Sequence, residues 1–440
     1  MSLAPHRLGI LCAGGPAPGL NSVIGAATIR ASLSGVEVLG ILDGFQHLME
    51  GDTTHAVRLR IEDVSRLHFR GGSSLGISRA NPTLDPRKME NTLRALRELG
   101  VNKLLTIGGD GTAASAWRLA QASKGALRVV HVPKTIDNDL DLPAEIDTFG
   151  FQTARHFGVE IVSNLMNDAR TTRRWYIVVT MGRKAGHLAL GIGKAAGATI
   201  TVIPEEFPDR KVDLKTLTDT LAGAMIKRVA HGRPYGVAVV AEGLIEALPP
   251  EDLAPFDNGE RDQHGNLVLS ELSLATILKD SVKAHLRERG LKTTVVGKDI
   301  GYELRCCDPI PFDMEYTRDL GYCAARFIID GGTGAMVSMQ GGHFIPIPFE
   351  ELVDLTTGRA KVRMVDVESE RYRIARTYMI RLRHEDFVVP SQLARLAEVV
   401  GLTPEAFSNR YGYLAANDPG IGPLRGTIPP AHGDAVPGWG

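Results

Sequence analysis

The sequence predicts an α/β fold with mainly parallel sheets, because short apolar runs alternate with helical stretches in both halves of the 440-residue chain. The first half has strand-like runs at 8–12, 36–41, 104–107 and 128–132, and helices expected at 21–32, 85–99 and 113–122. The pattern restarts with runs at 176–180, 198–203 and 236–241, around helical stretches at 184–196 and 213–229. Two α/β units are therefore expected.

Local signals justify the boundaries of individual elements. Asn21 is a suitable cap for the helix that follows the first strand. Asp85 followed by Pro86 starts another helix, and Gly100 is placed to end it. Further along, residues 331–334 predict a turn before a strand at 335–339, and residues 390–400 predict a helix. The Gly- and Pro-rich residues 416–440 predict an arm outside both units.

Composition excludes several classes of protein. Lys+Arg (50) and Asp+Glu (51) balance to a net charge of -1, which gives no support for a nucleic-acid or membrane partner. Apolar runs are too short for a spanning helix, and the first residues do not resemble a signal peptide, so we expect a cytoplasmic protein. Four cysteines are too few for a disulfide scaffold, and the scattered histidines lack HExxH spacing. Any metal should therefore be bound by carboxylates.

Two glycine loops follow strands and begin helices. The segments Gly14 to Gly19 and Gly108 to Thr112 each present backbone amides at a helix start, which suits a phosphate group, although a tight turn would explain either loop alone. Asp110 lies within the second loop, and a carboxylate repels phosphate unless a cation intervenes. Mg²⁺ is the natural candidate for that cation.

A third loop carries acidic residues. In the segment 135–139, Asp137 and Asp139 share a face if the chain is extended, so one carboxylate could act as a base while the other orients it. A solvated acidic turn is the alternative. Arginines also follow strands or flank glycines, and together with the glycine loops they predict a site for a phosphorylated substrate: Arg79, Arg174, Arg183 and Arg305.

The motifs in this chain resemble those of the phosphofructokinases, in the same order and over residues 7 to 385. They are AGGPAPGLN (13–21), GGDGT (108–112), PKTIDND (133–139), MGR (181–183), IPEE (203–206) and GYELR (301–305). The resemblance implies two Rossmann-like α/β domains with the active site in the cleft between them. It places a donor-binding domain at 1–147 plus about 306–353, and a sugar-phosphate-binding domain at 148–305 plus about 354–415.

The resemblance also implies residue roles. Asp137 would be the general base for the 1-hydroxyl of fructose 6-phosphate, supported by Thr135 and Asp139, while Asp110 positions Mg²⁺ and Arg79 reaches the transferring phosphate. Donor-binding residues would be Gly14, Gly15, Arg79, Gly108, Gly109, Asp110, Gly111, Thr112 and Lys134, with Gly14 also catalytic. Substrate-binding residues would be Asp139, Arg174, Met181, Gly182, Arg183, Glu205, Tyr302 and Arg305, with Lys298 replacing an arginine that the family has before Tyr302.

The family uses two phosphoryl donors, and this chain carries a signal for each. ATP users commonly have Gly at the position of Gly111, where a side chain would crowd the nucleotide, whereas pyrophosphate users have Asp. Lys134 and the sequence of the AGGPAPGLN motif resemble those of the pyrophosphate branch. On the steric argument we expect ATP, with a reversible pyrophosphate-dependent enzyme as the alternative.

Three further expectations follow from the resemblance. Arg174 matches an arginine often supplied by a neighbouring subunit, so we expect a homodimer or homotetramer. A catalytically silent regulatory subunit is a rival class, against which the intact Asp110, Asp137 and Arg183 argue. A dinucleotide-dependent dehydrogenase is disfavoured because GxGxxG is missing from the first strand-to-helix turn.

Overall fold

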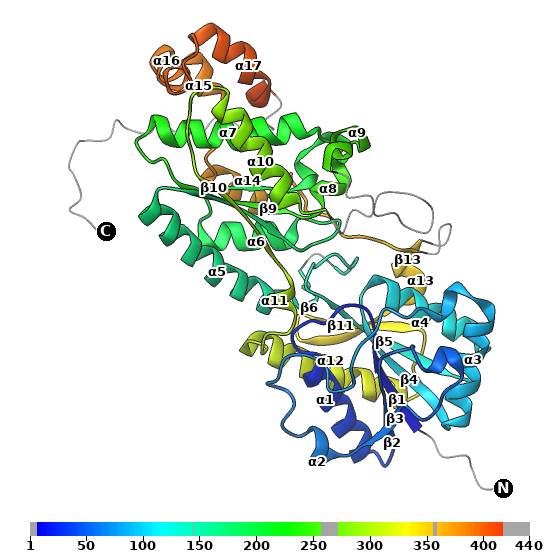
Figure 1. The fold of residues 1–440 in the computed structure, drawn as a ribbon. Helices are drawn as coiled ribbons and strands as arrows, with labels where there is room; N and C mark the ends of the chain where they lie inside the picture. The colour runs from blue at the N-terminus through cyan, green and yellow to red at the C-terminus, as the bar shows by residue number, and fades with distance from the viewer. Residues whose placement is uncertain (1–6, 144, 257–271, 355–358, 417–440) are drawn as a thin grey trace, which may run out of the picture.

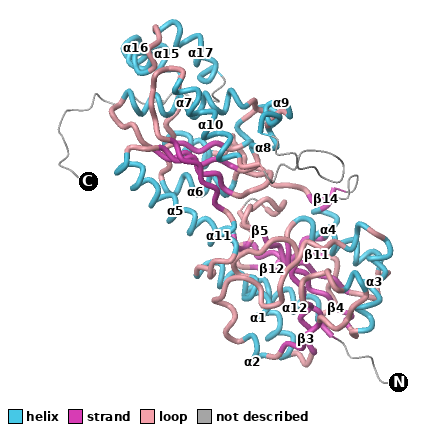
Figure 2. Tube along the Cα trace, in the orientation of Figure 1, coloured by secondary structure: helices cyan, strands magenta, loops and turns pink. Residues whose placement is uncertain are grey.

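The computed structural model describes residues 7–143, 145–256, 272–354 and 359–416. Its strands gather in two separate groups, each surrounded by helices (Figures 1 and 2). A larger sheet, the first sheet, and a smaller one, the second sheet, form these groups. The two α/β series expected from the sequence are thus both present.

The first sheet has a parallel centre and antiparallel edges. Its strands run in the order β12-β11-β5-β4-β1-β2-β3, with β6 paired to β5. The outer pairs β2/β3 and β11/β12 are antiparallel. The strands are β1 (Arg7–Cys12), β2 (Glu37–Ile41), β3 (Ala56–Leu59), β4 (Val101–Gly108), β5 (Arg128–Thr135), β6 (Phe149–Gly150), β11 (Ala335–Gln340) and β12 (His343–Pro348).

Helices cover both faces of the first sheet because residues alternate in direction along each strand. Leu8, Ile10 and Cys12 of β1 pack with α1 (Leu20–Leu33) and α12 (Pro311–Ile329). Leu11, on the other face, packs with α3 (Pro86–Glu98) and α4 (Asp110–Ala122). Shorter elements of this part are η1 (Leu48–Glu50), α2 (Ile61–Val64), η2 (Pro82–Leu84) and α13 (Phe349–Leu352).

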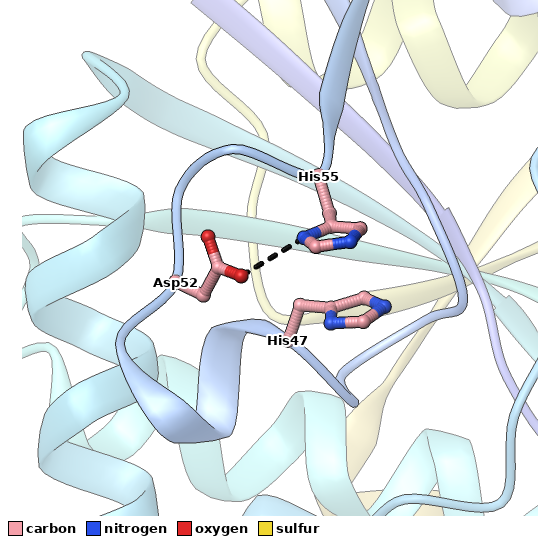
Figure 3. Close-up of side chains that lie close together, drawn as sticks. All are labelled: His47, Asp52 and His55. Atoms are coloured by element: carbon pink, nitrogen blue, oxygen red, sulfur yellow. Dashed lines mark hydrogen bonds and ion pairs between the residues drawn. The ribbon is translucent and has the colours of Figure 1, made fainter.

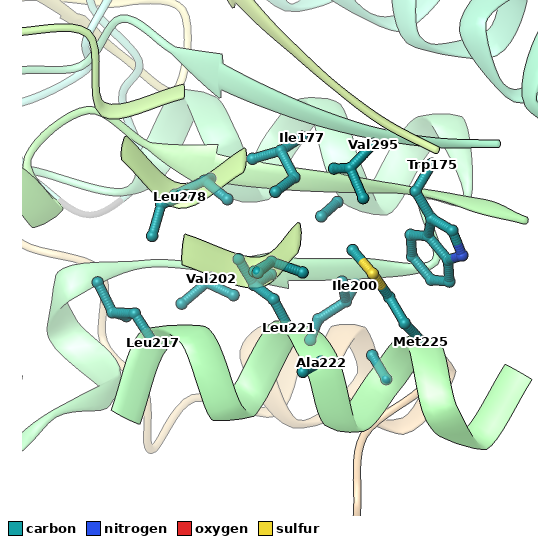
Figure 4. Close-up of a cluster of buried hydrophobic side chains, with 14 of the residues drawn as sticks. Trp175, Ile177, Ile200, Val202, Leu217, Leu221, Ala222, Met225, Leu278 and Val295 are labelled. Atoms are coloured by element: carbon teal, nitrogen blue, oxygen red, sulfur yellow. The ribbon is translucent and has the colours of Figure 1, made fainter. Parts of the chain in front are cut away.

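The second sheet is parallel throughout, in the order β10-β7-β9-β8. Its strands are β7 (Trp175–Thr180), β8 (Ile200–Val202), β9 (Gly236–Ala241) and β10 (Val295–Ile300). On one face, Trp175 and Ile200 pack with Leu221 and Met225 of α7 (Leu214–Ala230) and with residues of α10 (Leu274–Arg287) (Figure 4). The opposite face is covered by α5 (Phe151–Thr172) and α6 (His187–Ala196).

The C-terminal helices pack on the second sheet's side of the molecule. They are α14 (Glu370–Tyr378), α15 (His384–Val388), α16 (Pro390–Val399) and α17 (Pro404–Ala416). Asp219 on α7 is fully buried and accepts hydrogen bonds from Lys215, Arg410 and Tyr413, which ties α17 to α7. The remaining elements are η3 (Pro204–Glu206), η4 (Pro208–Arg210), α8 (Leu244–Ala247), α9 (Pro250–Leu253), η5 (Ala254–Phe256), α11 (Tyr302–Arg305), β13 (Val353–Asp354) and β14 (Arg359–Ala360).

Some local predictions hold and others are wrong. Asp85 caps α3 by accepting a hydrogen bond from the Arg87 amide, and Gly100 beyond the helix adopts a φ of +68°. Asn21 is not a cap: it lies inside α1, where its side chain bonds the carbonyls of Arg70 and Gly71. Asn21 therefore bonds a distant backbone segment instead of the amides at the start of its own helix.

Two boundaries also differ from the expectations. β5 continues to Thr135, and α4 begins at Asp110, so Asp110 lies in the first turn of a helix. The predicted arm falls almost wholly on residues 417–440, outside the described residues.

No helix among the described residues is both long and apolar enough to cross a membrane.

Candidate active site

A cavity of about 500 Å³ lies between loops of the two sheets. On the side of the first sheet, loops that follow β1, β4 and β5 contribute to it. On the side of the second sheet, segments that follow β7, β9 and β10 contribute Met181, Arg183, Glu242, Tyr302 and Arg305. These segments all lie at the carboxyl ends of parallel strands, where ligands bind in open α/β sheets.

The two glycine loops are adjacent because β1 pairs with β4, with Cys12 opposite Ile107. Strand order reverses between these strands, since β2 lies beyond β1 and β5 lies beyond β4. Gly19 and Gly109 hold the N-cap positions of α1 and α4, and no described side chain caps either helix. Only the start of α4 lines the cavity, so its amides are left for a ligand and the positive end of its dipole favours an anion. The start of α1 is buried, and the first glycine loop lines the cavity through Gly14 and Gly15.

Glycine is required in these loops for different reasons. Gly14 and Gly19 adopt φ values of +90° and +102°, which L side chains rarely adopt. At Gly108 a Cβ would lie 2.4 Å from Cβ of Thr112, so the turn into α4 has no room for one. At Gly111, by contrast, a Cβ would meet no atom of the described residues within 4 Å. The cavity is therefore open at this position.

Lys134 lies beneath the first glycine loop. Its side chain is buried, and Nζ donates a hydrogen bond to the Gly15 carbonyl. Burial lowers the pKa of Lys134 to about 8, although the nearby Asp137 raises it. Lys134 therefore places a positive charge directly beneath the first glycine loop, at the point where Gly14 and Gly15 line the cavity.

Asp137 is buried and has the properties of a general base. Burial and the neighbouring Asp139 and Glu242 raise its pKa to about 7, against the opposing effects of Lys134 and Arg183. Its Oδ1 is buried without a hydrogen-bond partner among the described residues. A buried carboxylate with an unused oxygen, lining a cavity, can accept a proton near neutral pH.

The acidic loop, residues 136–143, is held from both ends. The Thr135 hydroxyl accepts a hydrogen bond from the Asp137 amide at 3.0 Å. Asn138 adopts a φ of +56°, and its side chain bonds Asp147 and the Thr148 amide. This left-handed residue sets the directions of the carboxylates on either side of it.

Arg363 clamps the same loop from the far end of the chain. Its guanidinium donates to the carbonyls of Asn138 (3.2 Å) and Ile146 (2.7 Å) and also to the Asn138 side chain. The Arg363 amide donates to the Asp139 carbonyl at 2.9 Å. The Arg363 carbonyl faces Nε2 of His187 at the start of α6. One residue thus connects the acidic loop with a helix of the second sheet.

Charged side chains bridge the two sheets across the cavity. Arg183 Nη1 lies 3.4 Å from Asp110 Oδ1, and this pair is partly exposed. Glu242 Oε2 accepts the amides of Gly182 and Arg183 at 3.3 Å each, which fixes the turn after β7. Arg305 approaches Gly15 closely enough that a Cβ there would lie 3.4 Å from its Nη2.

Most of the expected site residues line the cavity, and five do not. Those that line it are Gly14, Gly15, Arg79, Gly109, Asp110, Gly111, Thr112, Lys134, Thr135, Asp137, Asp139, Met181, Arg183, Tyr302 and Arg305. Those outside its lining are Gly108, Arg174, Gly182, Glu205 and Lys298.

The five outlying residues have other surroundings. Gly108 ends β4, and Gly182 is held by Glu242. Glu205 is bound by the amides of Gly186 and Val365, so it braces the start of α6. Lys298 lies within β10, and Arg174 faces Asp168 at 3.8 Å.

Three aspartates line the cavity, and their carboxylates fit a magnesium ion. They are Asp110, Asp137 and Asp139, and burial together with the charge of Asp110 raises the pKa of Asp139. Among the described residues, however, these carboxylates do not meet as a three-ligand cluster. Mg²⁺ keeps several waters and takes oxygens from one or two carboxylates and from substrate phosphates, so a partial protein site is what it requires.

Sequence reasoning missed Glu242, Arg363 and Phe45. Glu242 follows the buried strand β9 just as Asp137 follows β5, so its position was a usable signal. Phe45 lines the cavity from a segment without any recognisable motif. Arg363 reaches Asn138 across 225 residues of sequence, and no local pattern reveals such a contact.

The fold and this cavity define an α/β protein with a cavity suited to phosphate groups: the start of α4, which no described side chain caps, lines it together with a buried carboxylate and three arginines. A family model described as phosphofructokinase matches residues 7–328. The chain belongs to the phosphofructokinase family and is a phosphotransferase acting on a hydroxyl acceptor.

Similar proteins include members with either donor in their names. A pyrophosphate–fructose 6-phosphate 1-phosphotransferase of Thermotoga maritima is 53% identical, over 92% of this chain and 98% of its own length. The protein of the same name from Naegleria fowleri is 45% identical, over 92% and 95%. An ATP-dependent 6-phosphofructokinase 3 of Streptomyces coelicolor is 33% identical, over 79% and 95%.

Solved structures share the fold at low identity. A pyrophosphate-dependent phosphofructokinase from Nitrosospira multiformis matches with a TM-score of 0.64 and 17% identity, over 90% of this chain and 92% of that one. The phosphofructokinase from Saccharomyces cerevisiae matches with a TM-score of 0.62 and 21% identity, over 92% of this chain. This chain spans about half of that yeast chain, 49% of its length.

Proposed function

We propose that the protein transfers a phosphoryl group from pyrophosphate to the 1-hydroxyl of fructose 6-phosphate. The observation that carries the proposal is the cavity that joins Asp137, the glycine loops and the arginines of both sheets. The choice of donor rests on the relatives: two proteins named for pyrophosphate are 53% and 45% identical to this chain, whereas the ATP-dependent proteins of Streptomyces coelicolor and Corynebacterium efficiens are 33% and 34% identical. This evidence favours the alternative donor over the ATP expected from Gly111.

Asp137 acts as the general base in this proposal. It removes the proton of the sugar's 1-hydroxyl, whose oxygen then attacks the terminal phosphorus of the donor in line. The bond from that phosphorus to the bridging oxygen breaks, and inorganic phosphate leaves. Thr135 and Asp139 orient the base: the Thr135 hydroxyl accepts the Asp137 amide, and Arg363 holds the backbone of Asp139. A correctly placed base of this kind contributes roughly 10²–10⁴ to the rate.

Positive groups stabilise the charge on the transferring phosphoryl group. The amides of Gly15 and of Gly109 to Thr112 would hold the donor phosphates, and Arg79 would contact the phosphoryl oxygens. The Gly14 amide is already bonded to the Ser78 carbonyl, so Gly14 would contribute through the shape of the loop. Met181, Gly182, Arg183, Tyr302 and Arg305 would bind the sugar phosphate, with Glu205 bracing the start of α6. Because little covalent chemistry is required of the protein, most of the rate comes from positioning and electrostatics.

A magnesium ion would be held by Asp110 together with donor oxygens. When bound, Mg²⁺ supplies positive charge that neutralises the oxygens of the donor. Arg183 currently faces the same carboxylate at 3.4 Å, so its side chain would turn towards the sugar phosphate once the ion binds.

One residue of the cavity, Lys134, also supports the choice of pyrophosphate. The open space at Gly111 would admit a nucleotide, so that position does not exclude ATP. Lys134, in contrast, places a cation under the loop that would receive the donor's phosphates. Pyrophosphate has no base or ribose to bury, so a compact cationic subsite is sufficient for it.

The test follows fructose 1,6-bisphosphate formation with Mg²⁺ and with ATP or pyrophosphate at equal concentration. Turnover with pyrophosphate, and phosphate-dependent reversal of the reaction, is the expected result. Turnover with ATP alone would refute the pyrophosphate proposal. Failure of both donors would support the catalytically silent regulatory subunit, and Asp137→Ser serves as the inactive control.

We also propose that the active form is a homodimer or homotetramer. Arg174 lies outside the cavity of its own chain and, from the family resemblance, would serve the cavity of a neighbour. Mixing inactive Asp137→Ser chains with inactive Arg174→Ala chains should restore part of the activity, because one of the two cavities in a mixed pair would combine Asp137 of one chain with Arg174 of the other. A monodisperse and fully active monomer would contradict this proposal.

A further inference from the structure

Two histidines and an aspartate converge on the loop between β2 and β3, away from the acidic loop. His47 precedes the short helix η1, Asp52 follows Gly51, and His55 precedes β3. Each of the three offers a ligand atom, and these atoms lie within 4.8 Å of one another. Nδ1 of His55 lies 2.9 Å from Oδ2 of Asp52.

The two imidazole rings are stacked, with centroids 3.5 Å apart and planes 6° from parallel. In Figure 3 one ring lies above the other, and a nitrogen of each ring is on the side towards Asp52. Neutral imidazole is the form that binds a metal ion.

Further contacts orient the three side chains. Nε2 of His47 faces Oδ2 of Asp43 at 3.4 Å, which leaves Nδ1 of His47 for a ligand. Thr54 donates from its amide (2.8 Å) and hydroxyl (2.7 Å) to Oδ1 of Asp52, which leaves Oδ2 towards the histidines. Carboxylates behind a ligating histidine and donors behind a ligating carboxylate are the usual supports of a metal site.

We propose that His47, Asp52 and His55 bind a transition-metal ion of the zinc class. Two imidazole nitrogens and one carboxylate oxygen suit Zn²⁺ or its neighbours, whereas Mg²⁺ and Ca²⁺ prefer oxygen ligands alone. The histidine side chains are 22% and 39% exposed, so a water molecule can complete the coordination.

Binding requires the rings to tilt towards each other. Lone pairs lie in the ring planes, and an ion about 2.0–2.1 Å from both nitrogens cannot lie in two parallel planes at once. Their partial exposure leaves the rings room to tilt. The site therefore closes around the ion and links η1 to β3.

The proposed ion lies near the donor end of the active-site cavity. Asp43, which supports His47, has its carbonyl bonded by the Ser78 hydroxyl at 2.6 Å. The Ser78 carbonyl in turn accepts the amide of Gly14 at 2.8 Å. This second metal site is separate from Asp110, because Asp110 does not belong to the cluster.

The test titrates the metal-free full chain with Zn²⁺ in excess Mg²⁺, by calorimetry and thermal unfolding. Cys306→Ser and Cys307→Ser are included in every chain, because these adjacent thiols could bind zinc themselves. One Zn²⁺ per chain and a higher unfolding midpoint are expected. His47→Gln and His55→Gln should each weaken binding at least 10-fold and remove most of the rise in midpoint.

His156→Gln is the matched control, since His156 is a half-exposed histidine 3.4 Å from Glu160 that has no second imidazole beside it among the described residues. It should bind zinc like the parent chain. Co²⁺ provides an independent spectrum, which should show nitrogen and oxygen ligation. Equal zinc affinity in the parent, His47→Gln and His55→Gln chains, each with an unchanged metal-free midpoint, would overturn the proposal.

Discussion

Replacing Asp137 by asparagine should abolish activity and at the same time stabilise the protein. The proposed base is buried among like charges, so its ionised form is unfavourable in the folded chain. An asparagine at this position would keep the size of the side chain, remove the charge and remove the base. Activity should therefore fall while stability rises, and a residue that served only packing would not show both changes.

The size of the stabilising effect follows from the pKa. Burial and neighbouring carboxylates raise the pKa of Asp137 from 3.8 to about 7. As pH rises from about 4 to 7, the unfolded chain loses this proton while the folded chain keeps it, so stability falls over that range. The full difference corresponds to at most roughly 4 kcal/mol.

Lys134 reduces the gain in stability that can be observed for Asp137→Asn. Its ammonium group loses a favourable partner when Asp137 is neutral, because Asp137 is what raises its pKa against burial. We therefore expect a gain on the order of 1–3 kcal/mol at pH 8, which is a few degrees in the unfolding midpoint. The gain should disappear below about pH 4, where the carboxyl is protonated in both the folded and the unfolded chain.

The assay measures the midpoint and turnover of Asp137→Asn from pH 4 to 9. Turnover should fall by roughly 10²–10⁴. Asp141→Asn is the control, because Asp141 lies in the same loop and is exposed. A lower midpoint for Asp137→Asn at pH 8, a pH-independent difference, or turnover within tenfold of the parent chain would refute the reasoning.

Other predictions concern residues around the base. Parent turnover should rise with pH through about 7, because Asp137 must lose its proton to act as a base; a flat profile from pH 5 to 8 would contradict this. Arg363→Gln should lower kcat by roughly 10² with little change in KM, since it loosens the loop that carries the base. Lys134→Gly should raise KM for pyrophosphate more than KM for fructose 6-phosphate, in steady-state assays. Asp313→Ala should lower the unfolding midpoint by several degrees, because buried Asp313 accepts the amides of Gly150 and Thr153.

Local sequence signals correctly predicted the three loops that contribute to the cavity. Strand ends followed by glycine or acidic residues predicted the loops at 14–19, 108–112 and 135–139, and the structure brings all three to one cavity. This succeeded because the carboxyl ends of parallel strands meet at one edge of a sheet, so a local rule has a three-dimensional consequence.

Local rules failed where a distant partner competed with them. Asn21 has the chemistry of a cap but bonds the backbone at residues 70–71, and β5 extends through Thr135 because β6 pairs beside it. The donor expected from Gly111 was likewise argued from one position. The space at that position does admit a nucleotide, but the similarity of the whole chain favours the other donor.

The sequence by itself thus determined the succession of strands and helices, the glycine loops and the residue types of the acidic loop. Only the tertiary structure decided which charges face one another across the cavity, such as Arg183 and Asp110. It also decided that Arg363 holds Asn138 and that His47 stacks on His55. Periodicity and capping act over a few residues, whereas these contacts depend on how two packed sheets are positioned, and no short stretch of sequence carries that information.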